Sequence, residues 1–414
     1  MRILVISNVF PRYEGDFSGN FVYELSKKLK ETTGFDIIIL TPHNPGSKLT
    51  EEMGNLKVYR FPYFYPYKYQ KMHIDDIKQK NFLIYLQAPF FFLSELFYAI
   101  RIIINEDIDI IHSQFIMPSS LIGGLCRKIF KIPNISTLHS SEVTLLQKLP
   151  LKNKVAKYIL DSSDGFTSVS SHRANEFLKI VYPDTNIKVD DMIKIIPMGV
   201  DSSSFKQYKD KLKLRETYMI DSMHVVLFVG RLVEVKGCEY LIRSFSNVVE
   251  KISDIQLLIV GSGSLEPKLK RIVADLNLEE YIRFVGPVNR DKISDFYSLS
   301  DIVVFPSIVE SSGFEEGIPV VVLEALMSGK PVIATKTKGV MEVIVDGYNG
   351  LLVAQKDPDQ IAEAIVTLLN NTELTEVLSE HALVVGSNYD WSAITEKYAE
   401  IFEDIHFDQT INVN

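Results

Sequence analysis

The chain has 414 residues, of which 46% are hydrophobic and 23% charged, a composition typical of a soluble α/β protein with a large core. This length favours two domains. The net charge of −9, without a dense basic stripe, argues against nucleic-acid binding, and only two cysteines, Cys126 and Cys238, argue against a disulfide framework and fit a reducing cytosol.

Charge is distributed unevenly along the chain. Residues 1–200 carry 24 Lys and Arg against 20 Asp and Glu, whereas residues 201–414 carry 20 against 33. A mildly basic half joined to a strongly acidic half suggests two domains that face different partners. The basic half could face an anionic membrane or a phosphorylated acceptor.

Short apolar runs alternate with helical stretches through most of the chain, the pattern of parallel α/β layers. In the first half, strands are expected at 3–7, 37–40, 57–61, 108–112, 135–138, 165–168 and 193–196. In the second half, strands are expected at 225–229, 256–260, 282–285, 302–305, 332–334 and 351–353.

The two sets of strands predict an α/β fold with two Rossmann-like domains and a cleft between them. The first domain is expected at 1–200 and the second at 223–388. The polar, lysine-rich segment 201–222 is the predicted linker, and 389–414 is predicted as a C-terminal helix with a frayed tail.

The N-terminal run 1–8 is too short for a signal peptide and reads as a first strand. Between that strand and a helix near Asn20 lies the glycine-containing loop 15–19. A phosphate could rest at this helix start beside Gly19, and capping by Ser18 explains the pattern equally well.

An aromatic segment, 61–69, is followed by lysines and then by a long apolar stretch, 82–104. This stretch could be a core helix, an interfacial helix anchored by aromatic and lysine side chains, or a membrane span. The residues that disfavour a membrane span are Gln87, Pro89, Glu95 and Arg101, and the flanking lysines are Lys71, Lys78 and Lys80.

His139 follows the expected strand 135–138, at the edge of an open sheet where active sites gather. A lone histidine is more often structural, so both interpretations stay open. No Cys/His cluster has metal-ligand spacing, and no metal site is expected.

Arg231 and Lys236 follow the expected strand 225–229, five residues apart. Two cations at one strand end could neutralise a departing diphosphate, or they could be ordinary solvated side chains. Gly261 and the pair Val285-Gly286 follow two other strands, where glycine permits either close approach to a ligand or a plain turn.

Glu316 and Glu324 bracket a Gly/Pro turn and an apolar helical segment. The turn leaves N–H groups unpaired at a helix start, where an anion can bind, with Glu316 at the mouth and Glu324 about two turns into the helix. A phosphate between two hydroxyl-binding carboxylates would suit a nucleotide sugar. An ordinary amphipathic helix with a solvated glutamate is the alternative.

In this order and spacing the segments resemble retaining glycosyltransferases of family 4, which have the GT-B fold. The resemblance covers most of the chain. Its segments are the N-terminal strand and glycine loop, 137–142, 197–201 with Phe205, 229–231 with 236–237, 260–263, 284–286, 306–307, 316–324, 329–335, Glu342, 346–347 and 349–353.

The resemblance implies that Arg231 and Lys236 bind the diphosphate, Glu316 the donor sugar hydroxyls and Glu324 the ribose hydroxyls. It places His139 beside the donor sugar, as a further catalytic residue. The other donor-binding residues that it implies are Gly19, Gly261, Val285, Gly317, Ile318, Pro319 and Val320.

The resemblance further implies no metal or other cofactor, a C-terminal helix that crosses back onto the first domain, and a same-face mechanism that retains configuration. This chain departs from many members at Lys338-Gly339 and Ser18-Gly19, where they have paired glycines. The form of 312–319 resembles members that extend surface polysaccharides or lipid-linked oligosaccharides.

The expected function is transfer of a hexose-type sugar from a UDP-linked donor to a saccharide or lipid-linked acceptor in cell-surface glycan synthesis. The enzyme is expected in the cytoplasm at the inner face of the plasma membrane, in peripheral contact with anionic lipid. The alternatives are a GT-B sugar-nucleotide epimerase, a phosphorylase, or a non-catalytic sugar-nucleotide-binding subunit.

Overall fold

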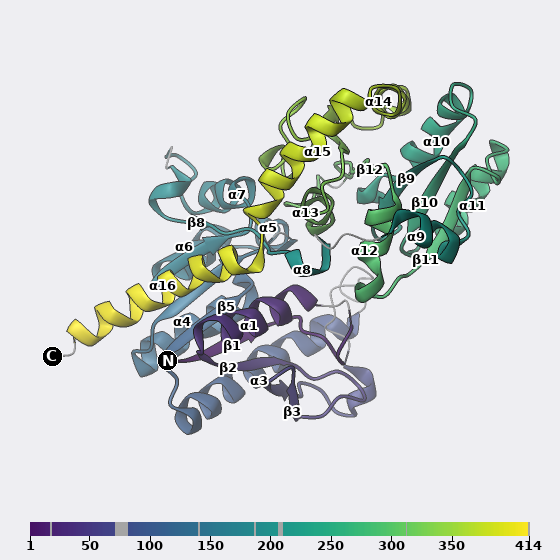
Figure 1. Cartoon of the computed structure of the whole chain (residues 1–414). Helices are drawn as coiled ribbons and strands as arrows, with labels where there is room; N and C mark the ends of the chain where they lie inside the picture. Colours follow the sequence, from purple (N-terminus) through teal and green to yellow (C-terminus); the bar gives the residue numbers. More distant parts are fainter. Residues whose placement is uncertain are drawn as a thin grey trace. The chain divides into compact units, whose positions relative to one another are not determined.

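The computed structural model describes residues 1–16, 19–70, 82–139, 141–185, 188–205, 210–311 and 313–412 (Figure 1). The chain divides into two compact units: unit 1 is Met1–Met198 with Ser392–Asn414, and unit 2 is Gly199–Trp391. The predicted cap at Ser18 and the predicted lysine anchors at 71, 78 and 80 lie outside the described residues.

Unit 1 contains an eight-stranded sheet in the order β3-β4-β2-β1-β5-β6-β7-β8, parallel except for the β3–β4 pair. The strands are β1 (Arg2–Ser7), β2 (Asp36–Pro42), β3 (Thr50–Met53), β4 (Leu56–Phe61), β5 (Ile110–Gln114), β6 (Asn134–Leu138), β7 (Gly165–Ser168) and β8 (Lys194–Ile195). The order reverses between β1 and β5, so the loops after these strands open at a topological switch point. All strands predicted in this half are present, and β3 was not predicted.

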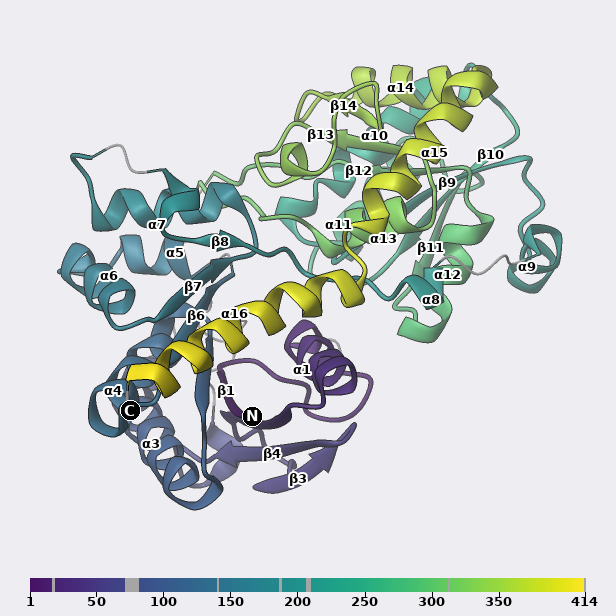
Figure 2. The ribbon, with the colours of Figure 1, turned by 60° about the vertical axis from the view of Figure 1, so that its left-hand side comes forward.

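Helices cover both faces of this sheet (Figure 2). α3 and α4 pack on β1, β2 and β5, whereas α5, α6 and α7 enclose a second core with β6 and β7. The helices are α1 (Asn20–Thr33), α3 (Phe82–Glu106), α4 (Leu121–Phe130), α5 (Ser141–Gln147), α6 (Lys152–Asp161) and α7 (Ser171–Val181), with single turns η1 (Tyr67–Tyr69), η2 (Ile116–Ser120) and η3 (Val189–Asp191).

The long apolar stretch forms helix α3, which packs one face on the sheet. Phe91, Ala99, Ile102 and Ile103 are buried in the core of unit 1, and the ionisable Glu95 is also fully buried. By length and composition the segment Leu86–Glu106 would reach across a membrane. Its packing on the sheet is that of a core helix, because spanning would strip this face of its partners.

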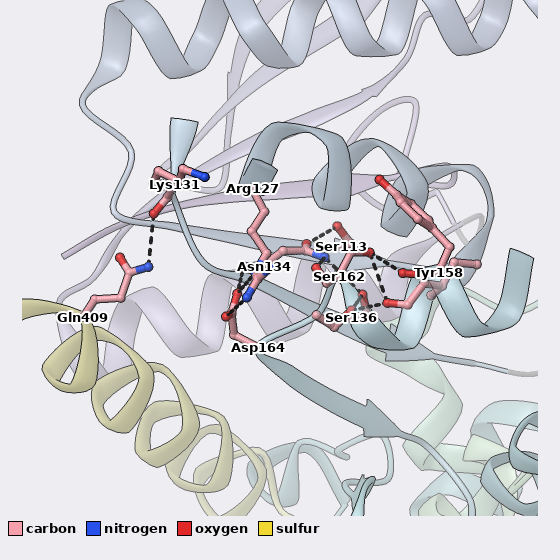
Figure 3. Close-up of polar contacts among 11 residues, drawn as sticks. Ser113, Arg127, Lys131, Asn134, Ser136, Tyr158, Ser162, Asp164 and Gln409 are labelled. Atoms are coloured by element: carbon pink, nitrogen blue, oxygen red, sulfur yellow. Dashed lines mark hydrogen bonds and ion pairs between the residues drawn. The ribbon is translucent and has the colours of Figure 1, made fainter. Parts of the chain in front are cut away.

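A polar network holds the amino ends of the strands in unit 1 (Figure 3). The carboxylate of Asp164 accepts two hydrogen bonds of 2.6 Å from the Arg127 guanidinium and one of 3.0 Å from the Asn134 backbone amide. The Asn134 side chain in turn accepts a 2.7 Å hydrogen bond from the Ser113 hydroxyl. These bonds tie together α4, β5, the first residue of β6 and the residue before β7.

The C-terminal helix α16 (Trp391–Asn412) belongs to unit 1 from Ser392 onward. The rings of Tyr398 and Phe402 lie 5.4 and 5.2 Å from the ring of His112 on β5. Near the end of the helix, the Gln409 amide donates to the Lys131 carbonyl at 3.1 Å (Figure 3). The predicted return of the C-terminal helix to the first domain is confirmed.

Unit 2 contains a six-stranded parallel sheet in the order β11-β10-β9-β12-β13-β14. The strands are β9 (His224–Val229), β10 (Ile255–Val260), β11 (Ile282–Gly286), β12 (Ile302–Phe305), β13 (Val332–Thr335) and β14 (Leu351–Val353). All six were predicted. The order reverses between β9 and β12, so this unit has its own switch point there.

Alternation along β9 supplies both cores of unit 2. Val226 and Phe228 point into the core formed with α10, α11 and α14, and Val225, Leu227 and Val229 point into the core formed with α12 and α13. The helices are α8 (Ser202–Phe205), α9 (Lys211–Tyr218), α10 (Cys238–Val249), α11 (Glu266–Asp275), α12 (Arg290–Leu299), α13 (Val320–Met327), α14 (Pro358–Asn370) and α15 (Thr372–Ser387), with single turns η4 (Glu234–Lys236) and η5 (Val340–Glu342).

The predicted linker 201–222 is instead part of unit 2. It contains α8 and α9, and its Phe205 is buried with its ring 5.6 Å from that of Tyr297. Ile220 is buried as well. The polar composition of the segment hid these few apolar anchors, which attach it to the core. The chain leaves unit 1 after Met198 and returns after Trp391, close to the predicted boundaries.

Candidate active site

Two loops at the switch point of unit 2 bring Lys236 and Glu316 together. Lys236 ends the loop after β9, and Glu316 lies on the loop between β12 and α13. The Lys236 Nζ lies 2.8 Å from Glu316 Oε2, and the side chains are only 11% and 19% exposed. A carboxylate therefore neutralises this half-buried ammonium, and an anion that bound here would share Lys236 with Glu316.

Arg231 stands on the same loop as Lys236, and its side chain is exposed. Among the described residues its guanidinium forms no hydrogen bond or ion pair, while the next residue anchors the loop through a 2.9 Å hydrogen bond from Leu232 N to Ser262 O. The structure therefore offers one cation free to meet an anionic ligand beside one that is already paired.

Glycines allow the switch-point loops to pack closely. Gly261 has φ +130°, and a Cβ there would overlap the carbonyl of Gly230 at the end of β9. A Cβ on Gly237, which follows Lys236, would overlap the carbonyl of Pro306 after β12. Close backbone packing thus requires glycine at 261 and 237. This packing fixes the position of the loop that carries Arg231 and Lys236.

Helix α13 begins later than the sequence suggested. Pro319 is extended, with φ −72° and ψ 127°, and caps a helix whose first residue is Val320. Glu324 therefore lies about one turn inside the helix, and the predicted two turns were wrong. First-turn amides of a helix have no acceptor one turn back. The Val322 amide donates instead to the Pro319 carbonyl at 3.0 Å. Ile318 and Val320 pack their side chains against the core of unit 2.

Two residues of α12, Tyr297 and Arg290, interact with Glu324. The Tyr297 hydroxyl lies 3.0 Å from Glu324 Oε2 and 3.1 Å from the Val321 carbonyl, which it can also reach as a donor. Burial raises the pKa of Glu324, and the positive charge of Arg290, the hydrogen bond from Tyr297 and the charge of Lys236 offset this in part. Arg290 and Tyr297 were not predicted, although their spacing of seven places them on one face of α12.

A second carboxylate, Glu315, holds the loop that faces Gly317. It is buried, accepts a 3.4 Å hydrogen bond from the Lys338 amide, and lies 3.3 Å from the Lys338 ammonium. A Cβ on the neighbouring Gly339 would overlap the carbonyl of Gly317. Lys338-Gly339 stands where many family members have paired glycines. In the structure Lys338 contacts Glu315, and Gly339 packs against the backbone of Gly317.

Val285 lies near the end of β11, two strands away from the switch point. Its side chain is half-buried against the core of unit 2. The neighbouring carbonyl, that of Gly286, accepts a 2.9 Å hydrogen bond from the Gly261 amide, so this strand end supports the loop after β10.

In unit 1, His139 follows β6 beside the switch point of that sheet. Its ring lies 4.4 Å from the ring of Phe115 and 4.9 Å from that of Phe21, and its backbone amide donates to Glu142 at 2.6 Å. Burial, together with the nearby His112, lowers the pKa of His139 to about 3. The imidazole is therefore neutral at physiological pH.

A buried polar chain selects the tautomer of His139. Its Nε2 lies 2.6 Å from Gln114 Oε1, which can only accept, so Nε2 carries the proton. The Gln114 amide nitrogen lies 3.0 Å from His112 Nε2, which also contacts the Thr137 hydroxyl at 2.8 Å. The remaining nitrogen of His139, Nδ1, is then a hydrogen-bond acceptor. Gln114 was not predicted.

Gly19 begins α1 in a left-handed conformation with φ +70°. A Cβ at this position would overlap the backbone of Val9 and Phe10, which follow β1. Glycine is required here so that the helix start approaches the end of β1 at the switch point of unit 1.

Comparison with known proteins places this geometry in a family. The model of glycosyl transferases group 1 matches residues 210–385, and the model of glycosyltransferase family 4 matches residues 18–204. The chain is a glycosyltransferase of family 4. The family resemblance and the enzyme class predicted from sequence are confirmed.

Curated relatives agree with this assignment. An uncharacterized glycosyltransferase of Methanocaldococcus jannaschii is 27% identical over 416 residues, covering 95% of this chain and 97% of the relative. The GDP-mannose-dependent alpha-(1-6)-phosphatidylinositol monomannoside mannosyltransferase of Mycolicibacterium smegmatis is 28% identical, covering 73% and 78%. One of these relatives is named for its donor and acceptor, and the other is named for no substrate.

Solved structures confirm the GT-B fold of the transferase. The Anabaena protein HepE in complex with UDP superposes with a TM-score of 0.74 at 19% identity, covering 98% of this chain and all of that one. Sucrose-phosphate synthase from Thermosynechococcus elongatus gives a TM-score of 0.75 at 22% identity, with 98% of both chains covered.

Proposed function

We propose that the enzyme transfers a hexose-type sugar, with retention of configuration and without a metal, from a UDP-linked donor to a saccharide or lipid-linked acceptor in cell-surface glycan synthesis. The Lys236–Glu316 pair at the switch point, with exposed Arg231 on the same loop, carries this proposal. Two cations supply the charge that a leaving diphosphate requires, and the carboxylate beside them suits sugar hydroxyls.

The carboxylates of unit 2 divide the donor between them in this proposal. Glu316 accepts hydrogen bonds from the sugar hydroxyls, and Glu324 accepts them from the ribose. Arg231, Lys236 and the first amides of α13 hold the diphosphate. Gly261 and Val285 set the walls of the donor site through the loops that they support.

In the first domain we assign His139 to the donor sugar, with Gly19 beside the phosphates. A neutral imidazole whose Nδ1 can only accept a hydrogen bond is suited to a sugar hydroxyl. In the same-face route, the leaving phosphate takes the proton of the acceptor hydroxyl as the new glycosidic bond forms. Configuration at the sugar is then retained.

The most specific part of this proposal is the identity of the nucleotide base in the donor. A relative is named for GDP-mannose, and a structural neighbour was solved with UDP. Thermal stabilisation by a panel of UDP- and GDP-linked hexoses would rank the donors, since a ligand that binds only the folded state raises the melting temperature. UDP-hexoses are expected to stabilise most.

The acceptor side of the proposal includes peripheral contact with an anionic membrane. Residues 1–200 have four more cations than anions, against a strongly acidic remainder, so this half is the one suited to anionic lipid. A place on the inner face of the plasma membrane would bring the enzyme to lipid-linked acceptors.

The proposal is tested by Glu316→Gln and Arg231→Ala, with Arg243→Ala on the same domain as a matched control. Arg243 is exposed on α10 and pairs with Glu239, away from the switch-point loops. Sugar transfer or slow donor hydrolysis is expected to fall about 10²–10³-fold in the first two variants, as for loss of one transition-state contact. Full activity in either would refute the site assignment. Release of an epimerised nucleotide sugar would favour the epimerase alternative.

A further inference from the structure

Helix α3 carries an apolar face that the protein leaves in contact with solvent. Its members recur with helical spacing and lie on the side opposite the buried face. They are Leu86, Phe90, Leu93, Phe97 and Ile104, all exposed. From first to last they extend over about 27 Å at 1.5 Å per residue. Contiguous apolar patches of this kind mark interaction surfaces in soluble proteins.

An open cavity of about 450 Å³ lies beside the amino-terminal part of this face. It is lined by Pro62, Tyr63, Phe64, Tyr65, Tyr67 and Phe90. Phe90 belongs to both features, so the apolar face of α3 and the cavity form one surface. The cavity is open to solvent and lined mainly by aromatic side chains, so it offers a recess for an apolar group.

The wall of the cavity is held in place by polar bonds to the protein beneath. The Gln87 amide donates to the Tyr69 carbonyl at 2.9 Å, and the Ser94 hydroxyl donates to the Pro62 carbonyl at 2.6 Å. The ring of Phe91 packs at 4.9 Å from that of Tyr63. The aromatic segment and α3 therefore act as one pre-formed element.

The charges on this surface are of one sign. Within the described residues 61–70 and 86–105, the exposed charged side chains are Lys68 and Arg101, and the single carboxylate, Glu95, is buried. Lys68 lies 5.1 Å from the centre of the Tyr69 ring. Tyrosines beside lysine and arginine, next to leucine and phenylalanine, are typical of proteins that rest at a membrane interface.

We propose that the apolar face of α3 and the aromatic cavity dock on an anionic lipid bilayer, and that the cavity takes part of a lipid chain. Lys68 and Arg101 contact the anionic headgroups, and the tyrosine hydroxyls lie in the hydrated headgroup region. This deepens the membrane contact proposed above and rests on it. A second copy of the chain is a poorer occupant, because two-fold pairing of this face would bring Lys68 and Arg101 of one copy toward the same cations of the other.

Vesicle binding by the full chain tests the proposal, with Phe97→Asp and the matched control Phe407→Asp. The two phenylalanines are 61% and 65% exposed, and Phe407 lies on α16, away from the apolar face. Co-sedimentation with phosphatidylglycerol vesicles is expected to weaken at least 10-fold for Phe97→Asp and to stay unchanged for Phe407→Asp. Equal binding by both variants, or no binding by the parent chain, would overturn the proposal, as would a dimer that Phe97→Asp dissociates without any lipid binding.

The cavity is tested separately with Phe90→Trp. The native Trp391 is only 3% exposed, so a new tryptophan can be followed against a buried background. Lipids brominated in the acyl chain are expected to quench Phe90→Trp and not Phe407→Trp; equal quenching of both would overturn the cavity assignment. Donor hydrolysis without lipid is expected to stay unchanged in Phe97→Asp. A parent chain that does not hydrolyse any donor would refute the proposed function. The vesicle results would still decide the membrane proposal by themselves.

Discussion

Replacing Gly339 by alanine is expected to disturb the donor loop more than the stability of the fold. The backbone at Gly339 has φ −66° and ψ −36°, which alanine adopts without strain. The added Cβ, however, would lie 2.9 Å from the Glu316 carbonyl oxygen and closer still to the Gly317 carbonyl. These are backbone atoms, so the loop must move by about 1 Å, and overpacking of this kind costs about 1–3 kcal/mol.

For a unit of this size, 1 kcal/mol corresponds to a shift of about 2–4 °C in Tm, so Gly339→Ala should melt about 2–12 °C lower. A displacement of about 1 Å at a site can reduce the rate about 10²-fold, and a loss of this order is expected in kcat/KM for the donor. Gly347→Ala is the control, because Gly347 has φ +73° with open space around it. It should lower Tm through strain and leave kcat/KM unchanged. Parent-like activity in Gly339→Ala would refute the reasoning.

Gln114→Ala removes the acceptor that fixes the tautomer of His139, so kcat should fall about 10-fold or more with little change in donor KM. ¹⁵N NMR of the imidazole reports the tautomer. An unchanged Nε2–H form would contradict the role given to Gln114. Burial raises the pKa of Glu95 to about 8, above its ordinary value. The contribution of the neutral carboxylic acid to the folding stability of the protein is therefore fully present below about pH 4.5, and it is lost as pH rises through about 8. Glu95→Gln stays neutral, and its urea midpoint should fall less between pH 5 and 9 than that of the parent; equal slopes would disprove the burial argument.

The parallel strands β1, β2, β9 and β10 were predictable because each is a nearly continuous apolar run that is almost wholly buried. The edge strand β3 was not, since Thr50–Met53 contains two glutamates and little apolar surface. It forms by antiparallel pairing with β4, and Glu51 there lies 2.7 Å from the fully buried guanidinium of Arg60. A strand that depends on a partner's buried charge leaves no periodic signal of its own.

The site was predictable residue by residue but not as a geometry. Lys236 and Glu316 are 80 positions apart, and they meet because β9 and β12 are neighbours in the sheet, an order that the sequence does not state. Tyr297 and Arg290 were missed for the same reason, since their role depends on α12 packing beside α13. Helix spacing could have paired these two residues with each other, but not with Glu324.

In the proposed function, the Lys236–Glu316 pair links recognition of the diphosphate to recognition of the sugar. An isolated half-buried ammonium would be costly, and so would an isolated carboxylate, so the ion pair at 2.8 Å offsets the two charges. Glu316 Oε2 forms no hydrogen bond among the described residues, which leaves it able to accept one from a ligand. When a diphosphate takes up the charge of Lys236, Glu316 loses part of its counter-charge and becomes a stronger acceptor for hydroxyl groups. A complete nucleotide sugar satisfies both partners, whereas a nucleotide alone satisfies only the lysine. On this argument the pair favours intact donor over spent nucleotide, which is the preference that turnover requires.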